Sequence, residues 1–221
     1  GLTSTTVKFT DAVTALTDDV AVTGDLVLLG NLVGVTTGSQ LDDNFTVTGT
    51  TNGDIEGRSL TVTAGSGKGN VTFTGAVGAT QKLGTLQVLS GATTTFGNTV
   101  RANNIALIST DIRFTGDVTA VTTDVSVNGN LTLLGNVTIT SGLLAGDDIS
   151  VSGTTEGDVA GRNLIVAAGL GSATFTGAVG ATQKLGTLAV TSGATTTFGS
   201  TVEADEIGLT STTVQLTGDV T

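Results

Sequence analysis

The stretch TFTGAVGATQKLGTL at Thr72–Leu86 returns without a change at Thr174–Leu188, 102 residues further along the chain. Other segments return at a slightly larger offset: GDLVLLGN from Gly24 reappears as GNLTLLGN from Gly129, 105 residues later. The opening GLTSTTVKFT likewise returns as GLTSTTVQLT from Gly208. Self-similarity at long, nearly fixed offsets is the sequence signature of repeat architectures. We therefore expect one continuous solenoid segment over residues 1–221, with long repeats at approximately 6–110 and 111–212 and the start of a third at 213–221.

A shorter period lies inside each long repeat. It consists of an apolar-x-apolar pair, as in Leu60/Val62, Leu86/Val88 and Ile105/Leu107. Successive pairs begin 15 to 26 residues apart, with a mean of about 21. Apolar residues at every second position indicate strands with one buried face. A unit of this size cannot bury its own apolar face, so neighbouring units must stack to cover it.

The composition favours strands joined by tight corners. The chain has 33 Gly, no Pro and a hydrophobic content of 38%, and Gly permits the positive φ angles that tight corners need. A leucine-rich repeat would need its Asn ladder, and propeller blades need longer units. The predicted fold is all-β, a right-handed parallel β-helix of roughly ten rungs with about 21 residues per rung. Its core should contain columns of like residues, such as Phe73, Phe96 and Phe114.

Charge and missing residue types exclude several classes of function. The net charge is −11, and nucleic-acid binding needs clustered Lys and Arg. Cys is absent, which excludes disulfides and thiolate metal sites. No stretch has the 18 or more apolar residues of a membrane span. No signal peptide or initiator Met opens the chain, and both ends fall in mid-pattern, so we expect an internal segment of a longer rod.

Polar residues often occupy the two positions before the apolar pair, as in Asp43-Asn44 and Asp147-Asp148. If every pair begins a new rung, the step of 15 residues places Arg58 one rung from Asp43 and Arg162 one rung from Asp147. The uneven steps then predict corner loops of different length that recur every fifth rung. In this arrangement the acids are solvated and form surface ion pairs with the two arginines, each of which stabilises the fold little.

The alternative for these acids is a calcium site, because carboxylate oxygens suit this hard cation. One set would combine Asp42 and Asp43 with Asp18 of the neighbouring rung. The second set would combine Asp147 and Asp148 with Asp124. No other cofactor is predicted, and the candidate metal ligands are therefore Asp18, Asp42, Asp43, Asp124, Asp147 and Asp148.

Two further motifs recur in both long repeats. The segments 53–57 and 157–161 resemble phosphate-binding loops, but neither has the Gly-Lys-Ser/Thr ending or a following helix, and we expect tight corners. The dipeptides Gln81-Lys82 and Gln183-Lys184 recur in identical surroundings. They are interpreted as solvated loop residues, with a partner-binding spot as the alternative.

The motifs TFTGAVG, TQKLGTL, VTSGATTTFG and NLTLLGNVT together resemble the repetitive stalks of giant bacterial adhesins, of the filamentous-haemagglutinin-like and autotransporter type. The resemblance covers the whole chain as a pattern. It implies a right-handed parallel β-helix, secretion to the cell surface, and a role in adhesion, biofilm matrix or sheath formation.

The predicted function is a structural segment of an extracellular or cell-surface bacterial filament. The expected partners are further repeats of the same chain end to end, with lateral or head-to-tail self-association and without nucleic acid or membrane insertion. An enzyme is not expected, because the carboxylates are spread by the repeat and Trp, Tyr and His are absent. An ice-binding or calcium-dependent binding solenoid is the alternative. Thr is also the ordinary outward residue of a strand, which weakens the ice-binding interpretation.

Overall fold

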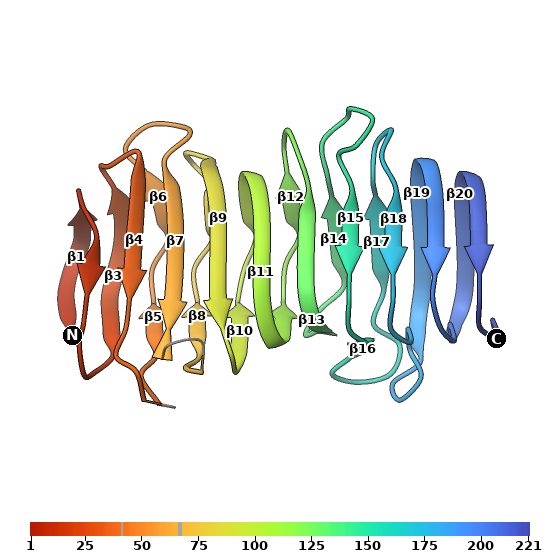
Figure 1. Ribbon diagram of the computed structural model, residues 1–221, viewed down its shortest axis with the longest axis horizontal. Coiled ribbons are helices and arrows are strands. Elements are labelled where there is room, and N and C mark those ends of the chain that lie inside the picture. The colour runs from red at the N-terminus through yellow and green to blue at the C-terminus, as the bar shows by residue number, and fades with distance from the viewer. Residues whose placement is uncertain (41, 66–67) are drawn as a thin grey trace.

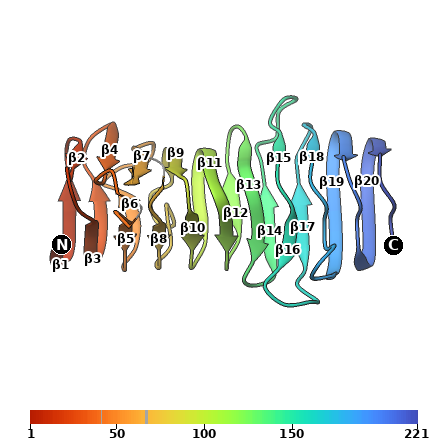
Figure 2. The same ribbon diagram turned by 60° about the horizontal axis from the view of Figure 1, so that its bottom comes forward.

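The computed structural model describes residues 1–40, 42–65 and 68–221 and shows a parallel β-solenoid (Figure 1). The chain winds through about nine turns of about 22 residues each. The termini lie at opposite ends of a straight rod, and the strands follow one another along it in chain order (Figure 2). No α-helix occurs in the described residues, and accordingly none there is long and apolar enough to cross a membrane.

The strands are short where the chain turns sharply and long where it bends smoothly around a corner. The longest, β11, bends through three successive segments of the coil and pairs with four other strands. The strands are β1 (Leu2–Phe9), β2 (Val13–Thr14), β3 (Val20–Leu28), β4 (Leu32–Thr36), β5 (Phe45–Val47), β6 (Thr51–Gly53), β7 (Ser59–Ala64), β8 (Val71–Phe73), β9 (Leu83–Ser90), β10 (Thr93–Phe96), β11 (Val100–Phe114), β12 (Val118–Ala120), β13 (Val125–Leu133), β14 (Val137–Thr140), β15 (Ile149–Val151), β16 (Thr155–Gly157), β17 (Leu164–Ala167), β18 (Ala173–Phe175), β19 (Leu185–Phe198) and β20 (Ala204–Leu216).

The partners of β11 are β9 and β10 of the preceding turn and β12 and β13 of the following turn. Every recorded pairing among the described strands is parallel and joins one turn to the next. Each turn contributes three segments, which fall into three columns that we call the first, second and third faces of the rod. The first face runs through Val22, Val47, Phe73, Phe96 and Phe114. The second runs through Leu26, Thr51, Val77, Val100 and Val118, and the third through Val35, Val62, Val88, Leu107 and Val127.

The predicted stacking of the apolar pairs is confirmed on the third face. Leu86 pairs with Leu60 of the preceding turn and with Ile105 of the following turn, and all three side chains are fully buried. Parallel strands lie about 4.8 Å apart, so each apolar side chain is covered above and below by its counterparts. Burying one such side chain stabilises the fold by about 1.5–3 kcal/mol before the entropic cost of folding is counted.

The predicted column of phenylalanines is also confirmed. Phe73 and Phe96 stack with ring centroids 5.3 Å apart and an interplanar angle of 2°, and Phe114 follows 5.5 Å beyond Phe96. Phe45 begins the column with an edge-on contact to Phe73 at 5.5 Å. Aromatic pairs at such distances contribute roughly 0.5–1.5 kcal/mol beyond the area that they bury.

The interpretation of the 15-residue steps is wrong. Phe45 pairs with Val20 and Val71 on the first face, whereas Leu60 pairs with Val33 and Leu86 on the third face. The two apolar pairs that start at Phe45 and Leu60 therefore belong to one turn and not to successive turns. Sequence periodicity alone cannot make this distinction, because strands on different faces have the same apolar-x-apolar pattern.

The long repeat does not contain a whole number of turns. From Leu2, four turns along the first face lead to Phe96. Leu107 is the equivalent of Leu2 in the next long repeat, and it lies two faces beyond Phe96 along the chain. One long repeat therefore equals four and two-thirds turns. As a consequence, equivalent residues of successive long repeats lie on different faces of the rod.

This offset also moves the loops around the rod. In Figure 1 the loop between β6 and β7 projects at the top, whereas the equivalent loop between β16 and β17 projects at the bottom. The loop between β14 and β15 projects at the top. Any surface feature encoded once per long repeat is thus presented on different edges in turn.

One corner depends on glycine. Gly24 bends β3 with a φ of +122°, and a Cβ at this position would lie 1.8 Å from the carbonyl oxygen of Ser4 in the preceding turn. Gly129, its equivalent, has a φ of +144° and the same conflict with Ser109. Only glycine combines this backbone conformation with so close an approach of the neighbouring chain.

Candidate functional site

The acidic corner residues bind the backbone of the next turn. Asp124 Oδ1 accepts a hydrogen bond of 2.8 Å from the backbone N–H of Asp148, and Asp148 Oδ1 accepts one of 2.7 Å from Ser172. The first long repeat has the same arrangement, in which Asn44 Oδ1 accepts a 2.8 Å bond from the N–H of Asn70. We call these two rows together the corner ladder. Asp19, Asn44 and Asn70 precede strands of the first face, whereas Asp124, Asp148 and Ser172 precede strands of the third face.

At these corners the chain departs from the strand conformation. The hydrogen bonds of the corner ladder there replace the backbone hydrogen bonds that join adjacent strands. A buried or half-buried N–H without a partner costs free energy, and a side-chain oxygen from the preceding turn supplies the missing acceptor. The same contact occurs in each long repeat at the corner that follows the corner ladder along the chain. Asp25 Oδ1 accepts a 2.7 Å bond from the N–H of Thr50, and Asn130 accepts one of 3.0 Å from Thr154.

Two of the predicted metal ligands close protruding loops. Asp147 is buried, its Oδ2 accepts a 2.8 Å hydrogen bond from the N–H of Leu144, and its carbonyl oxygen accepts one of 2.6 Å from Ser141 Oγ. Asp43 is buried in the equivalent loop, where Oδ2 accepts a 2.6 Å bond from the N–H of Gln40. Each carboxylate therefore stabilises its own loop through a hydrogen bond to the loop backbone.

The remaining candidates lie outside these loop contacts. Asp18 and Asp42 are exposed, and Asp18 Oδ1 accepts a 2.8 Å bond from the N–H of Asp19. Within residues 1–40, 42–65 and 68–221, no three acidic side chains are grouped in a way that could hold a metal ion. The calcium site stays a prediction, which a calcium titration followed by thermal unfolding would test.

The predicted ion pairs of the two arginines require correction. Arg58 Nε lies 2.6 Å from Asp54 Oδ1, and Arg162 Nε lies 2.6 Å from Asp158 Oδ1. Arg58 was expected beside Asp43 and Arg162 beside Asp147. The reason is the 15-residue step, which leads from one face to another within a turn and not from one turn to the next.

Both ion pairs lower the pKa of their aspartate. The hydrogen bond from Arg58 lowers the pKa of Asp54 below its ordinary value of 3.8, and that from Arg162 does the same to the pKa of Asp158. Each pair closes a sharp turn in which Gly57 or Gly161 has a positive φ. The expected tight corners at 53–57 and 157–161 are therefore confirmed as turns held by an aspartate–arginine pair.

The two recurring lysines also form ion pairs, but with partners that differ between the repeats. Lys82 Nζ lies 3.1 Å from Glu56, whereas Lys184 Nζ lies 3.1 Å from Asp205. Glu56 is replaced by Ala160 at the equivalent position, so Lys184 pairs with an acid of a different turn. Exposed pairs of this kind contribute little to stability.

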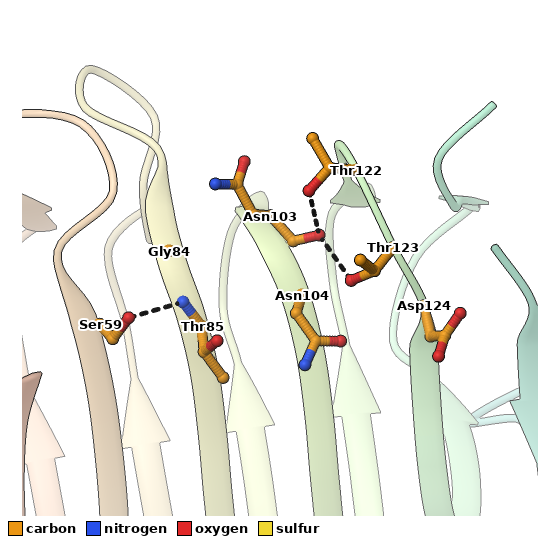
Figure 3. Close-up of a pocket in the computed structure, with 8 residues that line it drawn as sticks. All are labelled: Ser59, Gly84, Thr85, Asn103, Asn104, Thr122, Thr123 and Asp124. Carbon is orange, nitrogen blue, oxygen red and sulfur yellow. Dashed lines mark hydrogen bonds between the residues drawn. The ribbon is translucent and has the colours of Figure 1, made fainter. Parts of the chain in front are cut away.

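A polar groove of about 460 Å³ lies across several turns near one corner (Figure 3). The hydroxyl groups of Thr122 and Thr123 both point toward the carbonyl oxygen of Asn103, at 3.4 and 3.0 Å. On the other side of the groove, Ser59 Oγ accepts a 2.9 Å bond from the N–H of Thr85. These groups are already engaged in joining adjacent turns.

The groups that line this groove can donate and accept hydrogen bonds. Its lining consists of hydroxyl, amide and backbone groups together with one carboxylate, that of Asp124. No lining side chain provides a nucleophile paired with a general base, which is the arrangement that covalent catalysis requires. A second groove of about 440 Å³ crosses the corner ladder at Asn44 and Asn70 and has a similar polar lining.

Comparisons with protein-family models, with curated proteins and with solved structures found no match to this chain.

The corner positions are visible in the sequence, but their role as hydrogen-bond acceptors is not. The recurrence of Asp or Asn directly before the apolar pair was visible at Asn44, Asp124 and Asp148. The signal that pointed to backbone capping was the interchange of Asp, Asn and Ser at equivalent positions, as between Asn70 and Ser172. All three side chains can accept a hydrogen bond from a backbone N–H, whereas a calcium site would favour carboxylates.

Proposed function

We propose that the chain is a structural repeat segment of an extracellular or cell-surface bacterial filament or adhesin, with a role as stalk, sheath or biofilm matrix. The observation that supports this most is the unbroken stack of turns, in which the same turn sequence recurs near the N-terminus at β1, in the middle at β11 and near the C-terminus at β20. Such an array lengthens without a change in design, which suits a stalk.

The energetics of the rod also support a mechanical role. Three apolar columns and parallel backbone ladders continue from turn to turn, so stability is approximately a sum over neighbouring turns. Tension along such a rod is shared by many equivalent contacts. The acidic surface, with a net charge of −11, suits a soluble filament.

The four-and-two-thirds-turn repeat gives this proposed stalk a further property. Loops encoded once per long repeat project from different edges in succession, as the loops after β6 and β16 do in Figure 1. A stalk made of many such repeats would present the same loop on all sides, so that a bound partner could be reached from any direction around the rod.

The outward side chains of the first face do not favour the ice-binding alternative. On the first face, the row formed by Thr46, Thr72 and Thr95 continues into Arg113. An ice-binding surface needs a flat array of hydroxyl groups, and a guanidinium interrupts it. Measurement of thermal hysteresis on the purified chain would test this alternative.

Immunogold electron microscopy tests the proposed function. Antibodies raised against the 221-residue chain are applied to intact cells that produce the protein, with pre-immune serum as the control. The proposal expects gold particles along thin filaments outside the cell. Labelling that is confined to the cell interior, or to globular particles without filaments, would contradict it.

A further inference from the structure

The chain contains two Asn-Gly dipeptides, Asn52-Gly53 and Asn128-Gly129. The backbone nitrogen of a glycine can attack the side-chain amide of a preceding asparagine, because glycine has no side chain that hinders the approach. The attack closes a succinimide ring and releases ammonia. Whether it occurs in a folded chain depends on whether the fold holds the backbone N–H and the side-chain amide together or apart.

At Asn128-Gly129, both reacting groups contact one hydroxyl group of the next turn. Ser152 Oγ accepts a 3.0 Å hydrogen bond from the backbone N–H of Gly129. The same hydroxyl donates a 3.1 Å hydrogen bond to Asn128 Oδ1. A single oxygen atom therefore joins the nucleophilic nitrogen to the carbonyl oxygen of the amide that it would attack.

The backbone at this corner departs from the regular strand pairing. β13 shifts its register with β11 between Ile108 and Asp111, and Gly129 lies at this shift with a φ of +144°. Asn128 is exposed, so water has access to its side chain. The corner thus combines a proton-transferring hydroxyl, an accessible amide and a glycine nitrogen.

The second dipeptide, Asn52-Gly53, is held in a different way. Asn52 Oδ1 accepts hydrogen bonds from the backbone N–H groups of Thr80, at 3.1 Å, and Gln81, at 3.3 Å. Asn52 Nδ2 donates a 3.2 Å hydrogen bond to Thr50 Oγ1. Gly53 is buried in β6. These contacts fix the Asn52 amide, and none of them joins it to the N–H of Gly53.

We propose that Asn128-Gly129 is a self-modification site, at which the folded chain converts Asn128 into aspartate and isoaspartate with the hydroxyl of Ser152 as catalyst. The inference does not depend on the proposed filament function, because every reacting group except water belongs to this corner.

The reaction has two steps. Gly129 N attacks Asn128 Cγ, while Ser152 Oγ takes the proton from this nitrogen and gives its own proton to Asn128 Oδ1. The Cγ–Nδ2 bond of the resulting intermediate then breaks, and the proton on Oδ1 leaves with Nδ2 as ammonia. In the second step a water molecule opens the succinimide ring at one of its two carbonyl carbons, which gives aspartate or isoaspartate.

The first long repeat has the same corner without the reacting amide. Thr23-Gly24 stands at the equivalent of Asn128-Gly129, and Thr48 stands at the equivalent of Ser152. Thr48 Oγ1 accepts a 3.1 Å hydrogen bond from the N–H of Gly24. The hydroxyl therefore has a structural role in both repeats, and the asparagine adds the chemistry in the second repeat.

Peptide mapping by mass spectrometry measures both dipeptides in one sample. The folded chain is incubated at neutral pH in water enriched in oxygen-18, which labels each asparagine that is converted, and a second sample is kept unfolded in concentrated urea. In the folded chain, Asn128 should convert at least about tenfold faster than Asn52, because only its amide is held beside the attacking nitrogen. In urea the two asparagines should convert at similar rates.

Hydroxyl variants test the role of Ser152. Ser152→Ala should slow the conversion of Asn128 by about tenfold, because water replaces only part of the proton transfer. Ser152→Thr keeps the hydroxyl and should convert at the rate of the parent. Thr48→Ala is the matched control and should leave the rate at Asn128 unchanged. If Ser152 only held the corner together, its loss would loosen the corner and speed the conversion.

Each outcome decides the proposal. Faster conversion of Asn128 than of Asn52 in the folded chain, together with slower conversion in Ser152→Ala, supports it. Conversion of Asn128 no faster than that of Asn52 overturns it, and so does a Ser152→Ala variant that reacts as fast as the parent or faster. The comparison of the two asparagines uses the unaltered chain, so it decides the proposal even if a variant fails to fold.

Discussion

Leu107 lies on the third face of the rod, whereas Leu209, its equivalent one long repeat later, lies on the second face. The 102 residues between them wind through four turns and two further faces. Sequence identity between the repeats therefore does not imply an identical orientation in space. The loops of the proposed stalk are distributed around its axis for this reason.

Spin-label distances test this rotation. Labels at Ile55 and Val159, which are exposed and equivalent in the two long repeats, are separated along the axis by about 22 Å, from four and two-thirds strand spacings. Because they project from different corners, the measured distance should be clearly longer. A reference pair at Thr61 and Ser150, four turns apart on the third face, should give about 19 Å.

An Ile55–Val159 distance that equals the axial value would contradict the rotation. It would mean that the long repeat contains a whole number of turns and that equivalent loops share one edge.

The phenylalanine column should be sensitive to charge. Phe96→Asp places a carboxylate between Phe73 and Phe114, where no partner can compensate for its lost hydration, and should lower the free energy of unfolding by about 3–5 kcal/mol. Denaturant unfolding measures the change. Leu32→Asp serves as the matched surface control and should alter stability by less than about 0.5 kcal/mol. A Phe96→Asp variant as stable as the parent would place this side chain outside the core.

A buried threonine should be replaceable with a gain in stability. Thr51 is fully buried, and its hydroxyl oxygen has no hydrogen-bond partner. Thr51→Val keeps the shape and removes the unsatisfied group, so the free energy of unfolding should rise by about 1 kcal/mol.

The control for this prediction is Thr94→Val. Thr94 is equally buried, but its hydroxyl lies 2.6 Å from Ser109 Oγ, so the same replacement should destabilise the fold. Two variants that shift in the same direction would show that hydroxyl satisfaction does not set these stabilities.

The aspartate–arginine turns predict a pH dependence at low pH. The folded-state pKa of Asp54 is depressed by Arg58, so the stability that this pair contributes is present above the ordinary value of 3.8. It is lost as the pH falls from that value through the lower pKa of the folded state. Titration of the side-chain carboxyl carbon by NMR should show the low value, and Arg58→Gln should return it toward 3.8. An unchanged pKa in that variant would assign the shift to another cause.

The fold was largely predictable because the strongest pattern in the sequence reports burial. Leu60, Leu86 and Ile105 have the alternation of a strand with one buried face, and the recurrence of such pairs at a mean of about 21 residues implied stacking. The phenylalanine column followed from the same spacing. These inferences hold because each turn contacts only its neighbours, so a local pattern determines the packing.

The assignment of segments to faces was not predictable to the same degree. Phe45 and Leu60 look like successive rungs in the sequence, but the chain between them turns two corners within one rung. An apolar-x-apolar pair shows that a segment is a strand and does not show which face it joins. The ion pairs expected for Asp43 and Asp147 failed for this reason.

The role of the corner residues could not be derived from charge alone. Asp148 is a candidate calcium ligand, and its carboxylate also accepts a hydrogen bond from the backbone N–H of Ser172, a contact that its charge does not predict. A one-dimensional pattern does not show where an unpaired N–H of the next turn lies. The equivalence of Asn70 with Ser172 was the available sign that an acceptor was needed at these positions.

The register of the turns is tested most directly by two intramolecular disulfides. Thr61 and Gln87 are neighbours on adjacent turns of the third face, and their Cα atoms are expected about 4.8 Å apart. Thr61→Cys/Gln87→Cys should therefore close a disulfide within one chain, detected by mass spectrometry after proteolysis. Thr46→Cys/Thr61→Cys, whose positions are 15 residues apart on different faces, should remain reduced. Closure of the second pair, with the first pair left open, would contradict the three-faced stack.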